Sequence, residues 1–89
     1  GKYEESITSY EHAITIDPSD ADAWNSKGNS LDALKKYEEA ILAYEHAITI
    51  DPSDADAWNS KGNSLNSLGK RDEAKKCLDK AKELDDIDF

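Results

Sequence analysis

The sequence predicts an all-α protein of five helices that pair into antiparallel hairpins, and three observations lead to this prediction. Residues 10–31 recur without a change as residues 44–65, so the chain repeats with a period of 34 residues. Within each period, apolar residues are spaced three and four apart, as on one side of a helix. Asp-Pro pairs and a Gly interrupt this pattern where helices are expected to end.

We expect helices at roughly 2–16, 20–34, 37–50, 54–68 and 71–84. The first and third repeat one apolar pattern and end before Pro18 and Pro52, because the residue before a proline is pushed out of the α region. The second and fourth begin after short Asp-rich turns, where Asp54 can accept hydrogen bonds from free N–H groups. The fourth helix stops near Gly69, which tolerates positive φ. The unit is therefore a helical hairpin.

Two features describe how the hairpins pack and how the array ends. Gly28 and Gly62 interrupt good helices, which makes sense if a neighbouring helix passes too close for a side chain. The fifth helix carries Lys75 and Lys82 where the third has isoleucines. We interpret this charged face as the cap that a repeat array needs at its end.

The repeat resembles the tetratricopeptide (TPR) pattern W-x₂-L-G-x₂-Y…A-x₃-F…P. The first complete copy matches at Trp24, Gly28, Leu31, Ala40, Tyr44 and Pro52, and the second at Trp58, Gly62, Leu65, Ala74, Leu78 and Ala81. The resemblance covers the entire chain and implies a right-handed solenoid of hairpins in a single domain, 1–89. Residues 1–19 are then the second helix of a repeat, 20–53 a complete repeat and 54–88 a C-terminal capping repeat.

Lysines stand at the place of the family's leucine before the glycine, as Lys27 and Lys61. We expect their aliphatic stems to fill that slot while the ammonium groups reach water. The chain contains about two and a half repeats. Its abrupt start without Met leads us to expect that it is a fragment of a longer protein.

The resemblance implies a non-catalytic scaffold for protein–protein interaction, in which the first helices of the hairpins line a concave groove that takes up a peptide or helix of a partner. Helical geometry places polar residues on one side of these helices, opposite the tryptophan and glycine. We predict a peptide-binding groove formed by Asp22, Asn25, Asn29, Asp32, Asp56, Asn59, Asn63 and Asn66. A solvated polar face with no function is the alternative.

Asparagine donates and accepts hydrogen bonds, so such a ladder can pair with the backbone of an extended peptide. The aspartates add a preference for basic partners. A chaperone-tail-binding subgroup of the family looks similar at Lys27-Gly28-Asn29, but the cations with which it grips a carboxylate are absent here. Only Asn29 and Asn63 carry over, so we do not expect that activity.

Self-assembly is the competing function. The 2–16 helix matches the second helix of a hairpin whose first helix is missing, so an apolar face remains open at Tyr3, Tyr10 and Ala13. Exposed apolar area favours coverage by another chain. We therefore expect that the chain can form a homodimer through its first helix.

Eleven basic against twenty acidic side chains give a net charge of −9, which disfavours nucleic acid and anionic membranes as partners. No apolar run is long enough to cross a membrane. A lone cysteine, Cys77, gives no sign of an oxidising compartment, so we expect a cytoplasmic protein.

No residues point to a reaction or a cofactor. His12 and His46 lack a second ligand one turn away, and we interpret both as surface residues. The Asp-rich turns lack the glycine and distal glutamate of a calcium loop, so helix capping explains them better. Cys77 stands among small apolar residues with no base nearby. We expect neither an enzyme nor a bound metal.

Overall fold

The computed structural model describes residues 1–86, and in these residues five helices and no strand are present. The helices are α1 (Lys2–Ile16), α2 (Ala21–Ala33), α3 (Tyr37–Ile50), α4 (Ala55–Ser67) and α5 (Arg71–Asp85). Every bound lies within one residue of the prediction, which confirms the all-α fold class. The last two positions of the predicted capping repeat, 87 and 88, lie outside the described residues.

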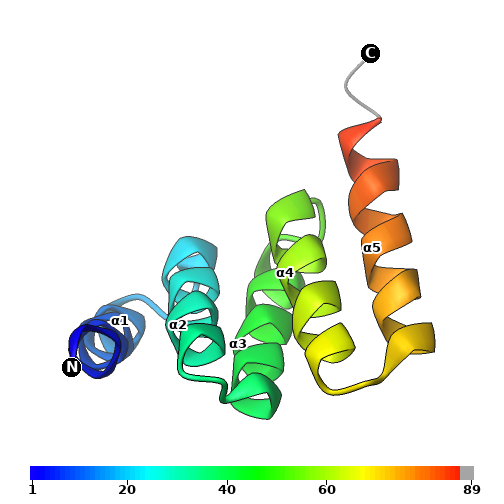
Figure 1. Ribbon diagram of the computed structural model, residues 1–89. Coiled ribbons are helices and arrows are strands. Elements are labelled where there is room, and N and C mark those ends of the chain that lie inside the picture. The colour runs from blue at the N-terminus through cyan, green and yellow to red at the C-terminus, as the bar shows by residue number, and fades with distance from the viewer. Residues whose placement is uncertain (87–89) are drawn as a thin grey trace.

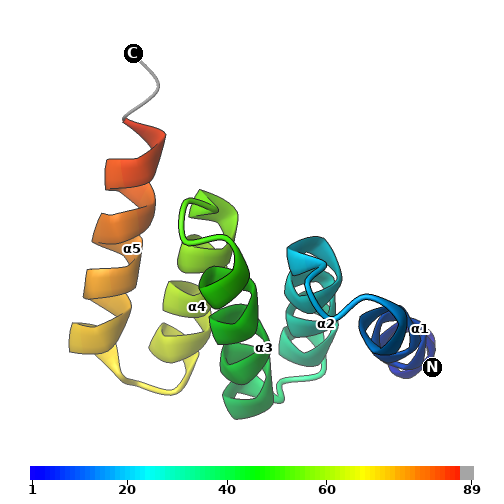
Figure 2. The same ribbon diagram turned by 180° about the vertical axis from the view of Figure 1, so that it is seen from behind.

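The helices stand side by side in chain order, with α1 at one end of the array and α5 at the other (Figure 1). Each helix packs against the next one in the chain, and α2 also touches α4. In residues 1–86 the backbones of α1, α3 and α5 do not approach one another. The array therefore has an inner face formed by α2 and α4 and an outer face formed by α1, α3 and α5, which Figure 2 shows from behind.

The turn before α4 shows why the Asp-rich segments start helices. The Asp54 side chain accepts hydrogen bonds from two backbone N–H groups in the first turn. Asp51 accepts from the backbone N–H and the hydroxyl of Ser53, and the indole N–H of Trp58 donates to the carbonyl of Pro52 at 2.9 Å. The turn before α2 repeats this arrangement, except that Asp20 accepts from one backbone N–H group, that of Ala23. Capping therefore accounts for the aspartate runs.

The other type of turn needs a left-handed residue after the helix. Gly69 has φ +79 and lies in the turn between α4 and α5, as its tolerance of positive φ predicts. The same position in the preceding turn is Lys35, which adopts φ +62 without being a glycine. The repeat thus keeps its backbone geometry although the residue differs.

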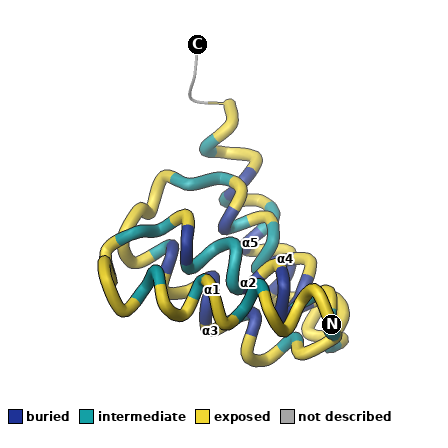
Figure 3. Tube along the Cα trace, turned by 90° about the vertical axis from the view of Figure 1, so that its left-hand side faces the viewer, coloured by how far each residue is buried: buried dark blue, intermediate teal, exposed yellow. Residues whose placement is uncertain are grey.

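The core consists mainly of alanines, together with Leu31, Tyr44, Leu65 and Cys77, and two helical glycines lie where neighbouring helices meet. A Cβ on Gly28 would lie 2.5 Å from the ring of Tyr44, and a Cβ on Gly62 would lie 2.8 Å from the Leu78 side chain. The predicted close approach of neighbouring helices is therefore confirmed. Burial is concentrated from α2 to α5, whereas α1 contains no buried residue (Figure 3).

Candidate functional site

The inner face carries the eight predicted groove residues, on α2 and α4. Six of them are exposed, namely Asp22, Asn29, Asp56, Asn59, Asn63 and Asn66. The other two, Asn25 and Asp32, are half-buried. In residues 1–86 no ion pair involves any of the three aspartates. Their charge is therefore not neutralised within the described part of the chain.

Asn29 has a structural role that the sequence did not reveal. Its Oδ1 accepts a 2.7 Å hydrogen bond from the hydroxyl of Tyr44, a residue of α3 that is only 1% exposed. Burial, together with the Asp32 carboxylate, raises the pKa of Tyr44 to about 12. Loss of the Asn29 side chain would leave a buried hydroxyl without its acceptor, so Asn29 contributes to the packing of α2 against α3 as well as to the polar face.

Asp32 connects the two inner helices. Its Oδ1 accepts a 2.8 Å hydrogen bond from the hydroxyl of Ser64, which is fully buried in α4. One carboxylate oxygen is thus used to hold successive repeats together. Asn66, at the corresponding place one repeat later, is exposed. The polar stripe therefore combines residues that bind neighbouring helices with residues that face water.

Asn25 differs from its copy in the next repeat. Its Oδ1 is shielded from solvent and accepts no hydrogen bond within residues 1–86. Asn59, which has the same sequence neighbours, is exposed. The Asn25 amide on α2 is therefore partly shielded from solvent, whereas the Asn59 amide on α4 is accessible to a ligand.

Two hollows lie on the outer face, where sequence reasoning did not look. One, of about 590 Å³, lies between α3 and α5 over α4, and its apolar lining includes Ile41, Leu42, Trp58 and Leu65. The other, of about 580 Å³, lies one period earlier between α1 and α3 over α2, where Ile7, Trp24 and Leu31 take the places of Ile41, Trp58 and Leu65. None of the eight predicted groove residues lines either hollow. The apolar i, i+3, i+4 pattern alone gives no sign that these residues border open space.

Lys27 and Lys61 line these hollows in the way the sequence predicts. The ammonium of Lys61 lies 3.2 Å from Glu45 and 5.8 Å from the centre of the Trp58 ring, and only 19% of its side chain is exposed. Lys27 repeats these contacts with Glu11 and Trp24. The aliphatic stems therefore fill the slot and the charges are neutralised at the rim.

His46 is exposed as expected, and its ring also stacks on that of Trp24 with centroids 4.0 Å apart. His12 is exposed as well. In residues 1–86 no group of three His, Cys, Asp or Glu side chains comes together where a metal ion could bind. Cys77 is buried, and this burial raises the pKa of its thiol, which disfavours the reactive thiolate.

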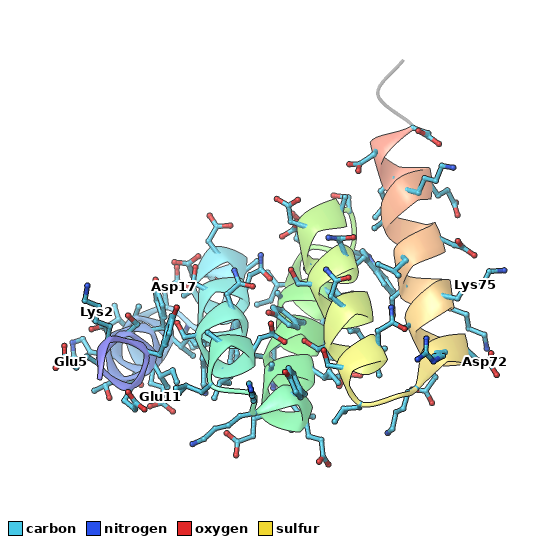
Figure 4. The ribbon with its side chains drawn as sticks, viewed as in Figure 1. Lys2, Glu5, Glu11, Asp17, Asp72 and Lys75 are labelled. Carbon is cyan, nitrogen blue, oxygen red and sulfur yellow. The ribbon has the colours of Figure 1, made fainter. Side chains whose placement is uncertain are left out.

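The open face of α1 differs from its copy on α3. Tyr44 and Ala47 are 1% and 0% exposed, whereas the corresponding Tyr10 and Ala13 are only half-buried, and Tyr3 is 50% exposed. Figure 4 shows Lys2 and Glu5 on the side of α1 that faces away from α2, and Lys75 on the side of α5 that faces away from α4. The described array thus ends in charged side chains on both sides, but tyrosines accompany them on α1.

These features define a class, the solenoids of repeated helical hairpins. The family comparison gives the specific family, since the tetratricopeptide repeat matches residues 21–54 and 55–86, and a TPR repeat profile matches residues 1–34. The chain belongs to the tetratricopeptide repeat family, whose fold is a protein-interaction module. A comparison with curated protein sequences gives no significant match.

Solved structures share this fold over almost the whole chain. A crystal structure of MamA is 32% identical and covers 98% of this chain and 51% of its own, with a TM-score of 0.94. The second TPR of Spaghetti (RPAP3) bound to the HSP90 peptide SRMEEVD is 32% identical, with coverages of 94% and 78% and a TM-score of 0.91. The first TPR of Spaghetti bound to that peptide is 28% identical. It covers 100% of this chain and 71% of its own, with a TM-score of 0.94. The present chain spans about half the length of MamA.

Among residues 1–86, no helix is both long enough and apolar enough to cross a bilayer.

Proposed function

We propose that the inner face binds a segment of a partner protein in extended or helical form. The observation that carries this proposal is the row of exposed polar side chains on α2 and α4, whose aspartates form no ion pair within residues 1–86. Two related TPR structures contain a bound peptide, which supports a peptide as the type of ligand. The scaffold would act by recruitment and carry out no reaction.

The chemistry of this face favours basic segments. Asn59 and Asn63 can each donate and accept hydrogen bonds with a peptide backbone, whatever its side chains. Asp22 and Asp56 attract Lys or Arg and repel carboxylates. The peptide in the Spaghetti structures, SRMEEVD, contains three acidic residues. We therefore propose a different, basic or neutral, ligand for this chain.

A binding experiment with three labelled peptides of equal length tests this proposal: one rich in Lys, one uncharged, and SRMEEVD itself. Fluorescence anisotropy should show the tightest binding for the Lys-rich peptide and the weakest for SRMEEVD. Affinity should also fall as salt rises, because exposed charges are screened over about 8 Å at physiological ionic strength. Equal affinities for the three peptides, or an affinity that does not change with salt, would contradict a preference for basic peptides.

The matched variant should avoid residues with structural roles. Asn59→Ala with Asn63→Ala removes two exposed amides that bond to no other side chain in residues 1–86, and it should weaken peptide binding. Thr49→Ala is the control, since Thr49 is exposed on α3 and its hydroxyl bonds only to its own helix. Equal affinities for both variants would exclude the inner face as the binding site.

Self-association is a second candidate function, favoured by the 50% exposure of Tyr3 on a helix that contains no buried residue. Two copies would cover the α1 face formed by Tyr3, Tyr10 and Ala13. In either case we propose a cytoplasmic protein that uses no cofactor, and the charge of −9 argues against nucleic acid as a partner.

A further inference from the structure

The first helix of the array is nearly a copy of the third. Residues 3–16 differ from residues 37–50 at only three of 14 positions, Ser6, Thr8 and Ser9. Residues 71–84 of α5 keep only three of those 14 residues, Glu73, Ala74 and Ala81. By sequence, α1 is therefore better suited than α5 to the contacts that α3 makes.

The structure shows what those contacts are. On α2, the ring of Tyr44 lies so close to Gly28 that no Cβ would fit, and its hydroxyl donates to Asn29 at 2.7 Å. Ala40 and Ala47 are fully buried on either side of it. The surface that receives α3 is thus a Gly-Asn pair on a helix that begins at Ala21 and is capped by Asp20.

The chain contains a second surface of this kind. Residues 55–65 of α4 are identical to residues 21–31 of α2, so Gly62 and Asn63 repeat the receiving pair. There α5 presents Leu78, which has no hydroxyl, and the Asn63 side chain makes no hydrogen bond within residues 1–86. Helix α5 therefore packs against Gly62 on α4 but makes no hydrogen bond to the side chain of Asn63.

We propose that α1 of one copy docks on α4 of a second copy and takes the place of α5. Tyr10 would then lie over Gly62 with its hydroxyl bonded to Asn63, as Tyr44 does at α2. Ser6 would replace Ala40, and its hydroxyl can bond to a carbonyl of the preceding turn. The docking displaces α5 of the second copy, and it deepens the second candidate function by naming the surface that covers α1.

The geometry of the repeat permits this exchange. In residues 1–86, the backbone of α1 approaches only that of α2 and the backbone of α5 only that of α4, so neither helix is held between two neighbours as α3 is. Replacing α5 by α1 of the next copy continues the order of helices found from α2 to α4. The contact joins α1 of one copy to α4 of the next, so it is head-to-tail.

Competition from α5 sets the concentration at which the exchange occurs. Because α5 is joined to α4 by a short turn, it competes at an effective concentration of about millimolar. Docking of α1 is favoured by the hydrogen bond between Tyr10 and Asn63, which Leu78 of α5 cannot make. We therefore expect a monomer in dilute solution and association at high concentration.

Sedimentation of the full chain at increasing concentration, with variants at position 78, tests the proposal. Leu78→Tyr gives α5 the ring and hydroxyl of α3, so it should hold α5 in place and reduce association. Leu78→Ser weakens α5 and should raise the association constant about tenfold. Adding Tyr10→Ser to Leu78→Ser should abolish that increase, whereas Thr8→Ala, an exposed change on α1, should not.

Cys77 reports on the release of α5, because its thiol is buried against α4 in the array. Its rate of reaction with a thiol reagent should rise with protein concentration in the parent chain. In the Tyr10→Ser variant this rate should not depend on concentration. A rate that rises equally in both would overturn the proposal.

Three other results separate this proposal from its alternatives. If Tyr10→Ser prevents association but neither Leu78 variant changes it, two α1 helices cover each other and only the docking on α4 is wrong. If Leu78→Ser associates regardless of Tyr10, exposed core is aggregating and the proposal fails. A parent chain and a Leu78→Ser variant that both stay monomeric at millimolar concentration would refute self-association through α1 altogether.

Discussion

Replacement of the two equivalent asparagines by alanine, one at a time, should have opposite effects on stability. Asn29→Ala removes the acceptor of the buried Tyr44 hydroxyl, which costs about 1–3 kcal/mol when the hydroxyl finds no full substitute. Asn63→Ala removes an exposed side chain opposite Leu78 and adds helix propensity, so it should be neutral or stabilise the fold by about 0.5 kcal/mol. Both variants exchange the same residues in a helix, so their difference isolates the hydrogen bond.

The expected difference of about 1–3.5 kcal/mol corresponds to a shift in Tm of at least about 4 °C for a chain of this size. Thermal unfolding followed by circular dichroism measures it. In a Tyr44→Phe background the hydroxyl is gone, so Asn29→Ala should then cost no more than Asn63→Ala, which completes a double-mutant cycle. Equal melting temperatures for the two single variants would refute the reasoning.

Three further predictions concern packing, pH and the end of the array. Gly28→Ala should destabilise the fold by about 1–3 kcal/mol, since its Cβ would lie 2.5 Å from the buried Tyr44 ring. Gly62→Ala should cost less, because its nearest contacts are to the Leu78 side chain and the backbone oxygen of Ala74 lies 3.2 Å away; equal midpoints in urea would contradict this. The folded-state pKa of Tyr44 is raised to about 12 from 10.0, so the stability it contributes is complete below pH 10 and is lost as pH rises towards 12. Tyr44→Phe should flatten that decline in a circular dichroism titration, and identical profiles would exclude burial of the phenol as its cause. Lys75→Ile with Lys82→Ile should promote association in sedimentation, because both lysines are exposed on α5; an unchanged monomer would count against a capping role.

The helices were predictable because their signals are local. The 34-residue period, Asp54 at the start of a helix and Gly69 after the end of one each act within a few residues, and the structure places the helix ends accordingly. The positive φ of Lys35 was not predictable in the same way. Lysine has no preference for that region, and the repeated geometry of the turn decides its conformation.

The candidate site was predictable only in part, because it depends on how helices meet. Helical geometry predicts which residues share a face, and six of the eight predicted residues are exposed. It does not show that Asn29 bonds to Tyr44 or that Asp32 bonds to Ser64, since these pairs are 15 and 32 residues apart. One signal was available, because Tyr44 and Leu78 differ at the position that faces the repeated asparagine.

An NMR titration of the ¹⁵N-labelled chain with the Lys-rich peptide tests the central claim most directly, because one spectrum contains reporters of both faces. The side-chain amides of Asn59 and Asn63 report on the inner face, and the indole N–H of Trp58, which lines an outer hollow, reports on the opposite one. Binding at the inner face should shift the asparagine signals and leave the indole signal in place. Shifts confined to the indole and to α3 and α5 would contradict the account and assign the peptide to the outer hollows.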